Sequence, residues 1–384
     1  MNLSDLDSLM CALLRGEAAE WPFMHIEGVE DEFVRRSDYQ GVTGLLNERL
    51  GKVPRWPVSL LQTLHRHAVA HTMWDIRHQL VITQLVEAFA RAKIPAVLVK
   101  GTALAHTLYR EPAQRQRGDT DVFVAPDDRQ RAVAALVAMG LTQDWGVSGD
   151  SVSYQSSHAL LASDGSDHSI DLHWRINNSE LLSRLFTFEE LLERAIPIPR
   201  LGADARGHGM VDALLLALMH RATHRNNPYY AHGTPHYGAN RLIWLYDIHL
   251  LANRLQAPDW RQFVDLARAK QLLGTCADGF HEARKRFETS IPGFVDRALL
   301  QPGSSEPVTR YLTGSSLEQQ WMDFAAIESG AGKLAFLREL IFPSAGYVRD
   351  KYAEARVGWL PWLYARRAGE GAIKRLARPR SNGI

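Results

Sequence analysis

Three aspartates stand in two segments whose alternation could bring them to one face of a sheet. Asp119 and Asp121 are two residues apart in the run Asp-Thr-Asp-Val-Phe-Val, so both side chains leave the same face of a strand. The later run Ser-Ile-Asp-Leu-His-Trp alternates in the same way and presents Asp171 beside His173. Neighbouring carboxylates repel one another unless a cation lies between them, and Mg²⁺ takes oxygen ligands of this kind. We therefore expect Asp119, Asp121 and Asp171 to bind Mg²⁺, with Mn²⁺ as the alternative ion.

A segment suited to phosphate precedes the aspartates. The apolar run Ile94–Val99 is short and rich in branched side chains, which predicts a buried strand. Lys100, Gly101 and Thr102 follow it, and Thr102 could cap a short helix. Backbone N–H groups at such a helix start bind phosphate, and Lys100 and Arg117 add positive charge. Phosphate binding beside metal-binding carboxylates predicts phosphoryl or nucleotidyl transfer.

Each feature alone also has an ordinary structural explanation. Two aspartates at i and i+2 occur in many surface strands, and Lys-Gly after a strand is common. The prediction depends on their combination, and the third carboxylate, Asp171, strengthens it.

With its order of strand, Gly-Thr, helix, Asp-x-Asp strand and a further strand with one aspartate, the chain resembles the nucleotidyltransferase fold shared with DNA polymerase β. More narrowly, it is similar to a bacterial family of uncharacterised nucleotidyltransferases, from about Leu60 to near the C-terminus. This similarity is carried by Val-Leu-Val-Lys-Gly-Thr-Ala-Leu (97–104), Tyr109, Arg117–Val124, Asp171–Trp174, His220 with His224, Arg241–Asp247, and the residues Phe342–Ser344, Arg349 and Tyr352.

The resemblance implies an α+β fold. Its core would be a polymerase β-like mixed sheet of about five strands with flanking helices, followed by a mostly helical C-terminal domain. It also implies that Asp119 and Asp121 are metal ligands and that Asp171 is the third carboxylate. Gly101-Thr102 departs from the usual Gly-Ser of the superfamily but keeps the hydroxyl group. The gap from Gly101 to Asp119 is longer than in most of the superfamily, though typical of the narrower family.

Composition describes an ordinary globular chain. It has 384 residues, of which 46% are hydrophobic and 23% charged, and this length suggests about two domains. The net charge of +1 gives no global electrostatic argument for nucleic acid. Cys11 and Cys276 lack metal-ligand spacing and fit a reducing compartment. No signal peptide is recognisable, and no apolar run reaches the roughly 20 residues of a membrane span. We expect a cytoplasmic protein without a transmembrane segment.

Periodicity and turn residues predict three segments. They are an N-terminal helical or irregular segment (1–56), a nucleotidyltransferase catalytic domain (57–200), and a helical C-terminal domain with a basic tail (201–384). A long helical pattern opens the second segment and runs from Pro57 to about Ala92. Further strands are expected at Leu141–Trp145, Val152–Ser156 and His158–Ala162, and a link at Ile196–Gly209.

Two histidines of the third segment are candidates for nucleotide binding. His220 and His224 stand four apart on one face of the apolar helix expected at 211–224, without the acidic partner of an H-E-x-x-H motif. They could hydrogen-bond Asp247, contact a phosphate or base, or be structural. The aromatic, glycine-rich stretch 226–240 is either a loop over the active cleft or a surface loop. The four histidines of the long helix, His65, His67, His71 and His78, are more often solvated or buried than metal-bound.

The C-terminal tail is basic, with six Lys or Arg against one glutamate between residues 366 and 380. Such a segment could contact RNA or an anionic membrane, or could be a solvated helix end.

The predicted activity is Mg²⁺-dependent transfer of a nucleoside monophosphate from a nucleoside triphosphate to an unidentified acceptor hydroxyl. The acceptor could belong to a protein, a peptide natural product, a sugar or other small molecule, or an RNA end. A nucleotide-sensing module without turnover and an RNA- or partner-binding scaffold are the alternatives. The three carboxylates favour the enzyme.

Overall fold

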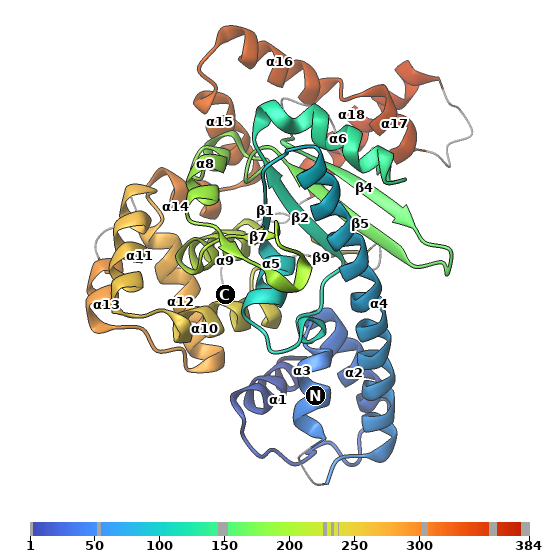
Figure 1. Ribbon diagram of the computed structural model, residues 1–384, viewed down its shortest axis with the longest axis vertical. Coiled ribbons are helices and arrows are strands. Elements are labelled where there is room, and N and C mark those ends of the chain that lie inside the picture. The colour runs from blue at the N-terminus through green and yellow to red at the C-terminus, as the bar shows by residue number, and fades with distance from the viewer. Residues whose placement is uncertain are drawn as a thin grey trace.

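The computed structural model describes residues 3–51, 55–144, 153–225, 229–231, 234–236, 238–300, 306–352 and 359–377. A central sheet lies between two groups of helices (Figure 1). One group is N-terminal and comprises α1 (Leu3–Arg15), α2 (Val29–Gln40) and α3 (Thr43–Leu50). The other lies at the opposite end of the long axis (Figure 1) and comprises α15 (Ser316–Ala326), α16 (Gly330–Ile341), α17 (Ala345–Lys351) and α18 (Leu360–Ala377).

The sheet is mixed and has seven strands within the described part of the chain, in the order β3-β4-β5-β2-β1-β7-β6. The pairs β2–β5 and β1–β7 are parallel and the others antiparallel. The strands are β1 (Ala96–Val99), β2 (Asp119–Val124), β3 (Thr142–Asp144), β4 (Gln155–Leu161), β5 (Asp167–His173), β6 (Ile196–Pro197) and β7 (Arg206–Gly207). The predicted fold class is confirmed, with seven strands instead of about five.

The two additional strands lie in the stretch that we expected to be a link. Both β6 and β7 are two residues long, too short to show the period of two that identifies a strand in a sequence. A β-carbon at Gly207 would lie 2.8 Å from a side-chain atom of Ile198, so the absence of a side chain lets β7 pack closely against Ile198, which follows β6.

Alternation along β2 places Asp121 on the opposite face of the sheet from Val122 and Val124. Val122 and Val124 belong to the hydrophobic core under the sheet, together with Leu98 and Ile170, whereas Asp121 faces the other way. A slip of one residue in pairing would bury the aspartates in that core, so the hydrophobic pattern fixes the register.

One strand replaces two predicted ones. Residues Gln155–Leu161 form β4, a single strand antiparallel to β5, where we expected a break near Ser156. The polar Ser156-Ser157 pair resembles a turn in the sequence but continues the ladder. The predicted turn before β5 is confirmed, with Gly165 at φ +82°. Trp145 and Val152, assigned to strands, lie outside the described residues.

The predicted long helix is confirmed as α4 (Val58–Arg91), with Pro57 directly before its first residue. It runs from the N-terminal helices to the sheet (Figure 1). Its first half contributes Leu60 and Leu64 to the larger hydrophobic core, and its second half contributes Ile82 and Phe89 to the core under the sheet. The sheet and the N-terminal helices are thus connected by one continuous helix.

The remaining helices surround the sheet. They are α5 (Lys100–Thr107), α6 (Arg129–Ala138), α7 (Glu180–Ser183), α8 (Phe188–Glu193), α9 (Met210–Thr223), α10 (Leu242–Arg254), α11 (Ala257–Ala269), α12 (Leu273–Phe287), α13 (Gly293–Leu299) and α14 (Pro307–Thr313). Helices α9–α14 share the larger core with α1–α3. The domain boundaries stay a prediction. No helix in the described ranges is both long and apolar enough to cross a bilayer.

The stretch 226–240 contains more regular structure than expected. Its segments β8 (Tyr229–Ala231) and β9 (Thr234–His236) form a two-stranded antiparallel ladder. The Gly233-Thr234-Pro235 sequence had suggested only irregular turns. Residues 226–228, 232–233 and 237 lie outside the described residues.

Candidate active site

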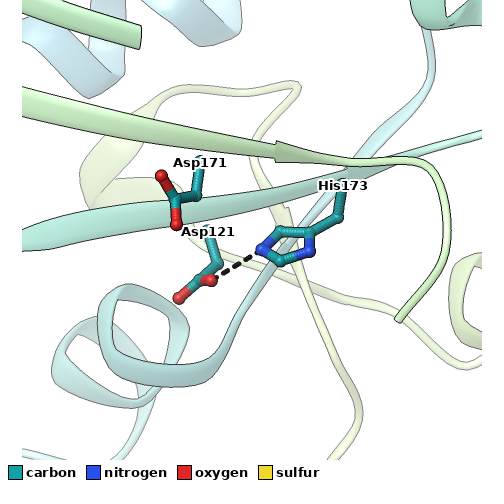
Figure 2. Close-up of side chains that lie close together, drawn as sticks. All are labelled: Asp121, Asp171 and His173. Atoms are coloured by element: carbon teal, nitrogen blue, oxygen red, sulfur yellow. Dashed lines mark hydrogen bonds and ion pairs between the residues drawn. The ribbon is translucent and has the colours of Figure 1, made fainter. Parts of the chain in front are cut away.

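Asp121 and Asp171 lie side by side on parallel strands. The register pairs Asp121 of β2 directly with Asp171 of β5, and His173 follows two residues later on the same face of β5. Ligand atoms of these three residues all lie within 4.8 Å of one another, and Figure 2 shows the side chains converging. The structure therefore brings together two of the three predicted carboxylates and adds an imidazole.

Two nitrogen groups contact one oxygen of Asp121. Lys100 Nζ lies 2.5 Å from Asp121 Oδ1, and His173 Nε2 lies 2.8 Å from the same atom. Asp121 and His173 are almost completely buried, whereas the Lys100 side chain is 27% exposed. Lys100 has a φ of +52°, a left-handed conformation that is unfavourable for a residue with a side chain. The first residue of α5 thus has a strained backbone at the point where its ammonium group reaches the carboxylate.

These charges separate the acidities of the two paired carboxylates. Burial alone would raise the pKa of Asp121, but the Lys100 ammonium and the His173 imidazole outweigh burial and lower it below its ordinary value. The pKa of Asp171 is raised by burial and then by the negative charge of Asp121. Burial would lower the pKa of Lys100, but the Asp121 carboxylate raises it. Asp121 is therefore the carboxylate that stays ionised, and Asp171 has the higher proton affinity.

Asp119 lies at the edge of the same face. It is exposed to solvent, and it is not a member of the 4.8 Å group formed by the other residues. Desolvation by the surrounding protein atoms, and then the charges of Asp121 and Asp171, raise the pKa of Asp119 to about 7. Water reaches the Asp119 side chain, so the part of the pKa shift that a substitution can test is the repulsion by Asp121 and Asp171.

Two polar residues of β4 bind Asp171, and no pattern in the sequence singles them out. Ser157 Oγ donates to Asp171 Oδ1 at 2.6 Å, and Gln155 Nε2 donates to Oδ2 at 3.1 Å. Ser157 is paired with Asp171 in the antiparallel register. Their alternation at positions 155 and 157 becomes informative only once β4 is known to be one strand beside β5. They fix the orientation of the Asp171 carboxylate.

A family model described as an uncharacterised nucleotidyltransferase matches residues 29–288 of the chain. The chain belongs to this family. The matched range begins and ends earlier than the resemblance inferred from sequence motifs, so α15–α18 lie outside it. No curated protein shows a significant match.

In this family member the segment predicted to bind phosphate, residues 100–102, is tightly packed. A β-carbon at Gly101 would lie 2.6 Å from Arg115 Nη1, so the glycine makes room for a guanidinium group. Thr102 does not cap α5, which begins two residues earlier with Val99 as its cap. Its buried hydroxyl instead lies 2.8 Å from Thr120 Oγ1. Any contact of Gly101 and Thr102 with phosphate would therefore come from their backbone N–H groups.

The two arginines before β2 are buried in ion pairs. Arg117, a predicted phosphate ligand, has a side chain only 2% exposed, with Nη2 2.6 Å from Asp75 Oδ1 of α4. Arg115 Nη2 lies 2.8 Å from Asp247 Oδ2, and Tyr109 donates to Asp247 Oδ1 at 2.6 Å. The second group ties the segment before β2 to α10. Sequence patterns could not reveal either pair, since the partners are far apart in the chain.

His220 and His224 form an aromatic cluster with Trp244 of α10. The His220 ring centroid lies 4.6 Å from that of His224 and 5.0 Å from that of Trp244, and His224 stacks on Trp244 at 4.9 Å. Burial, followed by the charges of His224 and Lys100, lowers the pKa of His220 well below its ordinary value. His220 is thus a neutral imidazole within electrostatic reach of Lys100. Its contact with nucleotide stays a prediction.

Proposed function

We propose that this chain is a nucleotidyltransferase that transfers a nucleoside monophosphate from a nucleoside triphosphate to an acceptor hydroxyl, with Mg²⁺ or Mn²⁺ as its metal ion. The observation that carries the proposal is the convergence of Asp121, Asp171 and His173 within 4.8 Å, in a chain of a nucleotidyltransferase family.

The donor set fits a divalent cation. Two carboxylates and one imidazole nitrogen provide oxygen and nitrogen ligands, a mixture that suits Mn²⁺ and is compatible with Mg²⁺. Asp119, at the edge of the same face, would be a further carboxylate ligand. A bound metal would neutralise phosphate charge and lower the pKa of the acceptor hydroxyl.

The remaining residues have roles that follow from their positions. Lys100 would donate to a phosphate oxygen once Asp121 is engaged by a metal, and the N-terminal N–H groups of α5 at Gly101 and Thr102 would bind the same phosphates. Arg117 would act only through its charge, because its guanidinium group is paired with Asp75. His220 and His224 would contact the nucleotide from the C-terminal end of α9.

Asp171 is the group that would accept the acceptor's proton. Its pKa is raised, and the hydrogen bonds from Ser157 and Gln155 hold its carboxylate in place. In the metal-free protein His173 would keep Asp121 oriented through the contact between its Nε2 and Asp121 Oδ1 at 2.8 Å. The attack would form a bond from the acceptor oxygen to the α-phosphorus and release pyrophosphate.

Binding of each of the four nucleoside triphosphates tests the site, measured by thermal shift with and without Mg²⁺ or Mn²⁺. We expect metal-dependent stabilisation of the wild-type protein that disappears in Asp121→Asn. Stabilisation by a triphosphate that is equal in the two proteins would place the nucleotide elsewhere.

Transfer itself is tested by incubating the protein with triphosphate labelled at the α-phosphate, or in parallel at the γ-phosphate, and with candidate acceptor pools. Nucleotidyl transfer attaches only the α-label to an acceptor. Binding without any transfer would support the nucleotide-sensing alternative, and attachment of the γ-label would indicate a kinase reaction.

A further inference from the structure

Exposed apolar side chains concentrate in the C-terminal helices. Of the nineteen large hydrophobic residues that are exposed in the described part of the chain, eight lie between residues 317 and 362. They are Leu317, Trp321, Leu334, Leu337, Ile341, Phe342, Trp359 and Trp362. Helices α15–α18 lie together at the end of the molecule opposite the N-terminal helices (Figure 1). Such a concentration on a water-soluble surface usually marks an interaction site.

Helical spacing groups these residues into stripes. Leu334, Leu337 and Ile341 of α16 follow the i, i+3, i+7 pattern of one helix face, and they are 70%, 40% and 58% exposed. Leu317 and Trp321 stand four apart on α15. Helices α15 and α16 therefore each have apolar side chains directed to solvent, in addition to the side that packs inward.

Contacts join the end of the α16 stripe to α18. The ring of Phe342 lies 5.7 Å from that of Tyr364, and Tyr364 donates its hydroxyl to the Pro343 carbonyl at 2.7 Å. Arg367 Nη1 donates to the Leu340 carbonyl at 3.2 Å. Trp362 is two residues before Tyr364. The apolar stripe of α16 and the tryptophans at the start of α18 are thus held in one continuous substructure.

Charge distinguishes this part of the chain from the rest. From the start of α15, residues 316–384 contain 11 Lys or Arg and 7 Asp or Glu, a net charge of +4. Residues 1–315 contain 33 Lys or Arg and 36 Asp or Glu, a net charge of −3. The near-neutral total therefore hides a basic end on an acidic body. Long-range attraction to an anionic surface would orient the molecule with this end foremost.

We propose that α15–α18 bind the surface of an anionic lipid membrane, with the leucine and tryptophan side chains inserted at the headgroup boundary. Exposed aliphatic and indole groups flanked by Lys and Arg are the combination that partitions into this interface. Each basic residue near an anionic membrane adds attraction without a specific contact.

Other occupants fit less well. RNA is held by direct phosphate contacts and base stacking, but two of the described arginines here are already engaged: Arg366 with Glu370 at 2.9 Å and Arg367 with the Leu340 carbonyl. RNA binding would also leave the exposed leucines of α16 without an apolar partner. Pairing of this surface with its counterpart in a second copy of the chain would bring together two segments of net charge +4.

The proposed surface is fixed relative to the candidate active site. Asp323 of α15 accepts from Ser179 Oγ at 2.6 Å and from the Leu181 N–H at 3.2 Å, in the segment that follows β5. The Tyr311 hydroxyl also donates to Asp323, at 2.8 Å. Membrane binding would therefore hold the sheet that contains Asp171 at a set orientation to the lipid.

Co-flotation of the full chain with vesicles tests the proposal. One set contains phosphatidylcholine alone, and in the other phosphatidylglycerol replaces about one third of it. We expect binding to the anionic vesicles only, weakened by high salt. The double variant Leu334→Gln/Leu337→Gln should bind anionic vesicles at least about tenfold more weakly than wild type does. The double variant Arg338→Gln/Arg349→Gln should weaken vesicle binding most at low salt. The matched control is Leu300→Gln, after α13, which changes a leucine that is 83% exposed and should bind as wild type does.

Four results would overturn the proposal. They are no vesicle binding, equal binding to neutral and anionic vesicles, equal effects of the α16 variant and the Leu300 control, and salt-sensitive RNA binding in place of vesicle binding. Self-association that the α16 variant abolishes, without vesicle binding, would assign the surface to a second copy. All of the changed side chains are exposed, so we expect each variant to fold. Thermal unfolding of each variant checks this.

Discussion

The ammonium group of Lys100 lies 2.5 Å from Oδ1 of Asp121, where it contacts a carboxylate of the group that could hold a metal ion. His173 contacts the same oxygen. A divalent cation bound to Asp121 would therefore meet a positive charge that is already in place. Because two cations repel each other at such a short distance, metal binding and the Lys100–Asp121 ion pair should compete.

Replacement of Lys100 by methionine should tighten metal binding in the absence of nucleotide. Removal of the competing charge is expected to raise the affinity for Mn²⁺ about tenfold, equivalent to about 1.4 kcal/mol, as measured by titration calorimetry or by the electron paramagnetic resonance signal of free Mn²⁺. The same variant should bind triphosphate more weakly, because Lys100 is a proposed phosphate ligand.

Lys93→Met is the matched control for that variant. Lys93 is exposed and, like Lys100, has a positive φ, +53°, so the backbone strain is comparable while the site is unchanged. Unaltered or weaker Mn²⁺ binding in Lys100→Met would show that the lysine and the metal do not compete.

Strands β1, β2 and β5 could be predicted from the sequence, and so could the common face of the aspartates on β2 and β5, because alternation is a local property. The rest of the site depends on pairing between distant segments. Ser157 became a partner of Asp171 only through the β4–β5 register. Arg115 and Asp247, 132 residues apart, form a buried ion pair that no local pattern reveals. Thr102 looked like a helix cap, but burial against Thr120 gave its hydroxyl another partner.

Asp119→Asn and Asp121→Asn should change the stability of the metal-free protein in opposite directions. Desolvation, together with repulsion by Asp121 and Asp171, raises the pKa of Asp119 to about 7, so the folded state binds more protons than the unfolded state from about pH 4 to pH 7. Stability is therefore lost as pH rises through that window, and Asp119→Asn should raise the melting temperature at pH 8. This gain should vanish below about pH 4.

Asp121→Asn should instead destabilise the protein at pH 8. The pKa of Asp121 is lowered, so its ionised form contributes stability above about pH 4 that is lost as pH falls further. Loss of the buried partner of Lys100 should cost about 3 kcal/mol. Melting curves at pH 8 and in acid, with a chelator present, measure both variants. A shift of equal sign at pH 8 would contradict the assigned charge pattern.

Gly101→Ala should destabilise the fold through a steric clash with Arg115. The added β-carbon would lie 2.6 Å from Arg115 Nη1, and the ion pair with Asp247 keeps the guanidinium from moving away. We expect a loss of about 1–3 kcal/mol in the free energy of unfolding, measured with urea. The control is Gly118→Ala, whose β-carbon meets no described atom within 4 Å and should change stability by no more than about 0.5 kcal/mol. Similar losses in both variants would exclude the clash as the cause.

His106 should make the fold sensitive to mild acid. Its ring nitrogens are buried without a hydrogen-bond partner among the described residues, and burial, then the charges of Arg117 and Arg200, lower the pKa of His106 to about 3. The unfolded chain therefore takes up a proton near pH 6.5 that the folded chain does not. Stability falls as pH drops below about 6.5, and the contribution of this residue between pH 8 and pH 5 is about 2 kcal/mol.

His106→Leu should remove that part of the acid sensitivity. Urea unfolding at pH 8 and pH 5 measures how much free energy of unfolding is lost between the two pH values. This loss should be about 2 kcal/mol smaller in the variant than in the wild-type protein. The exposed His25→Leu variant controls for the change in histidine number. An equal loss in wild type and His106→Leu would mean that this imidazole gains its proton while the protein is folded. In that case His106 would be charged beside Arg117, and the acid sensitivity would have to come from other buried groups such as His78, whose pKa burial lowers to about 2.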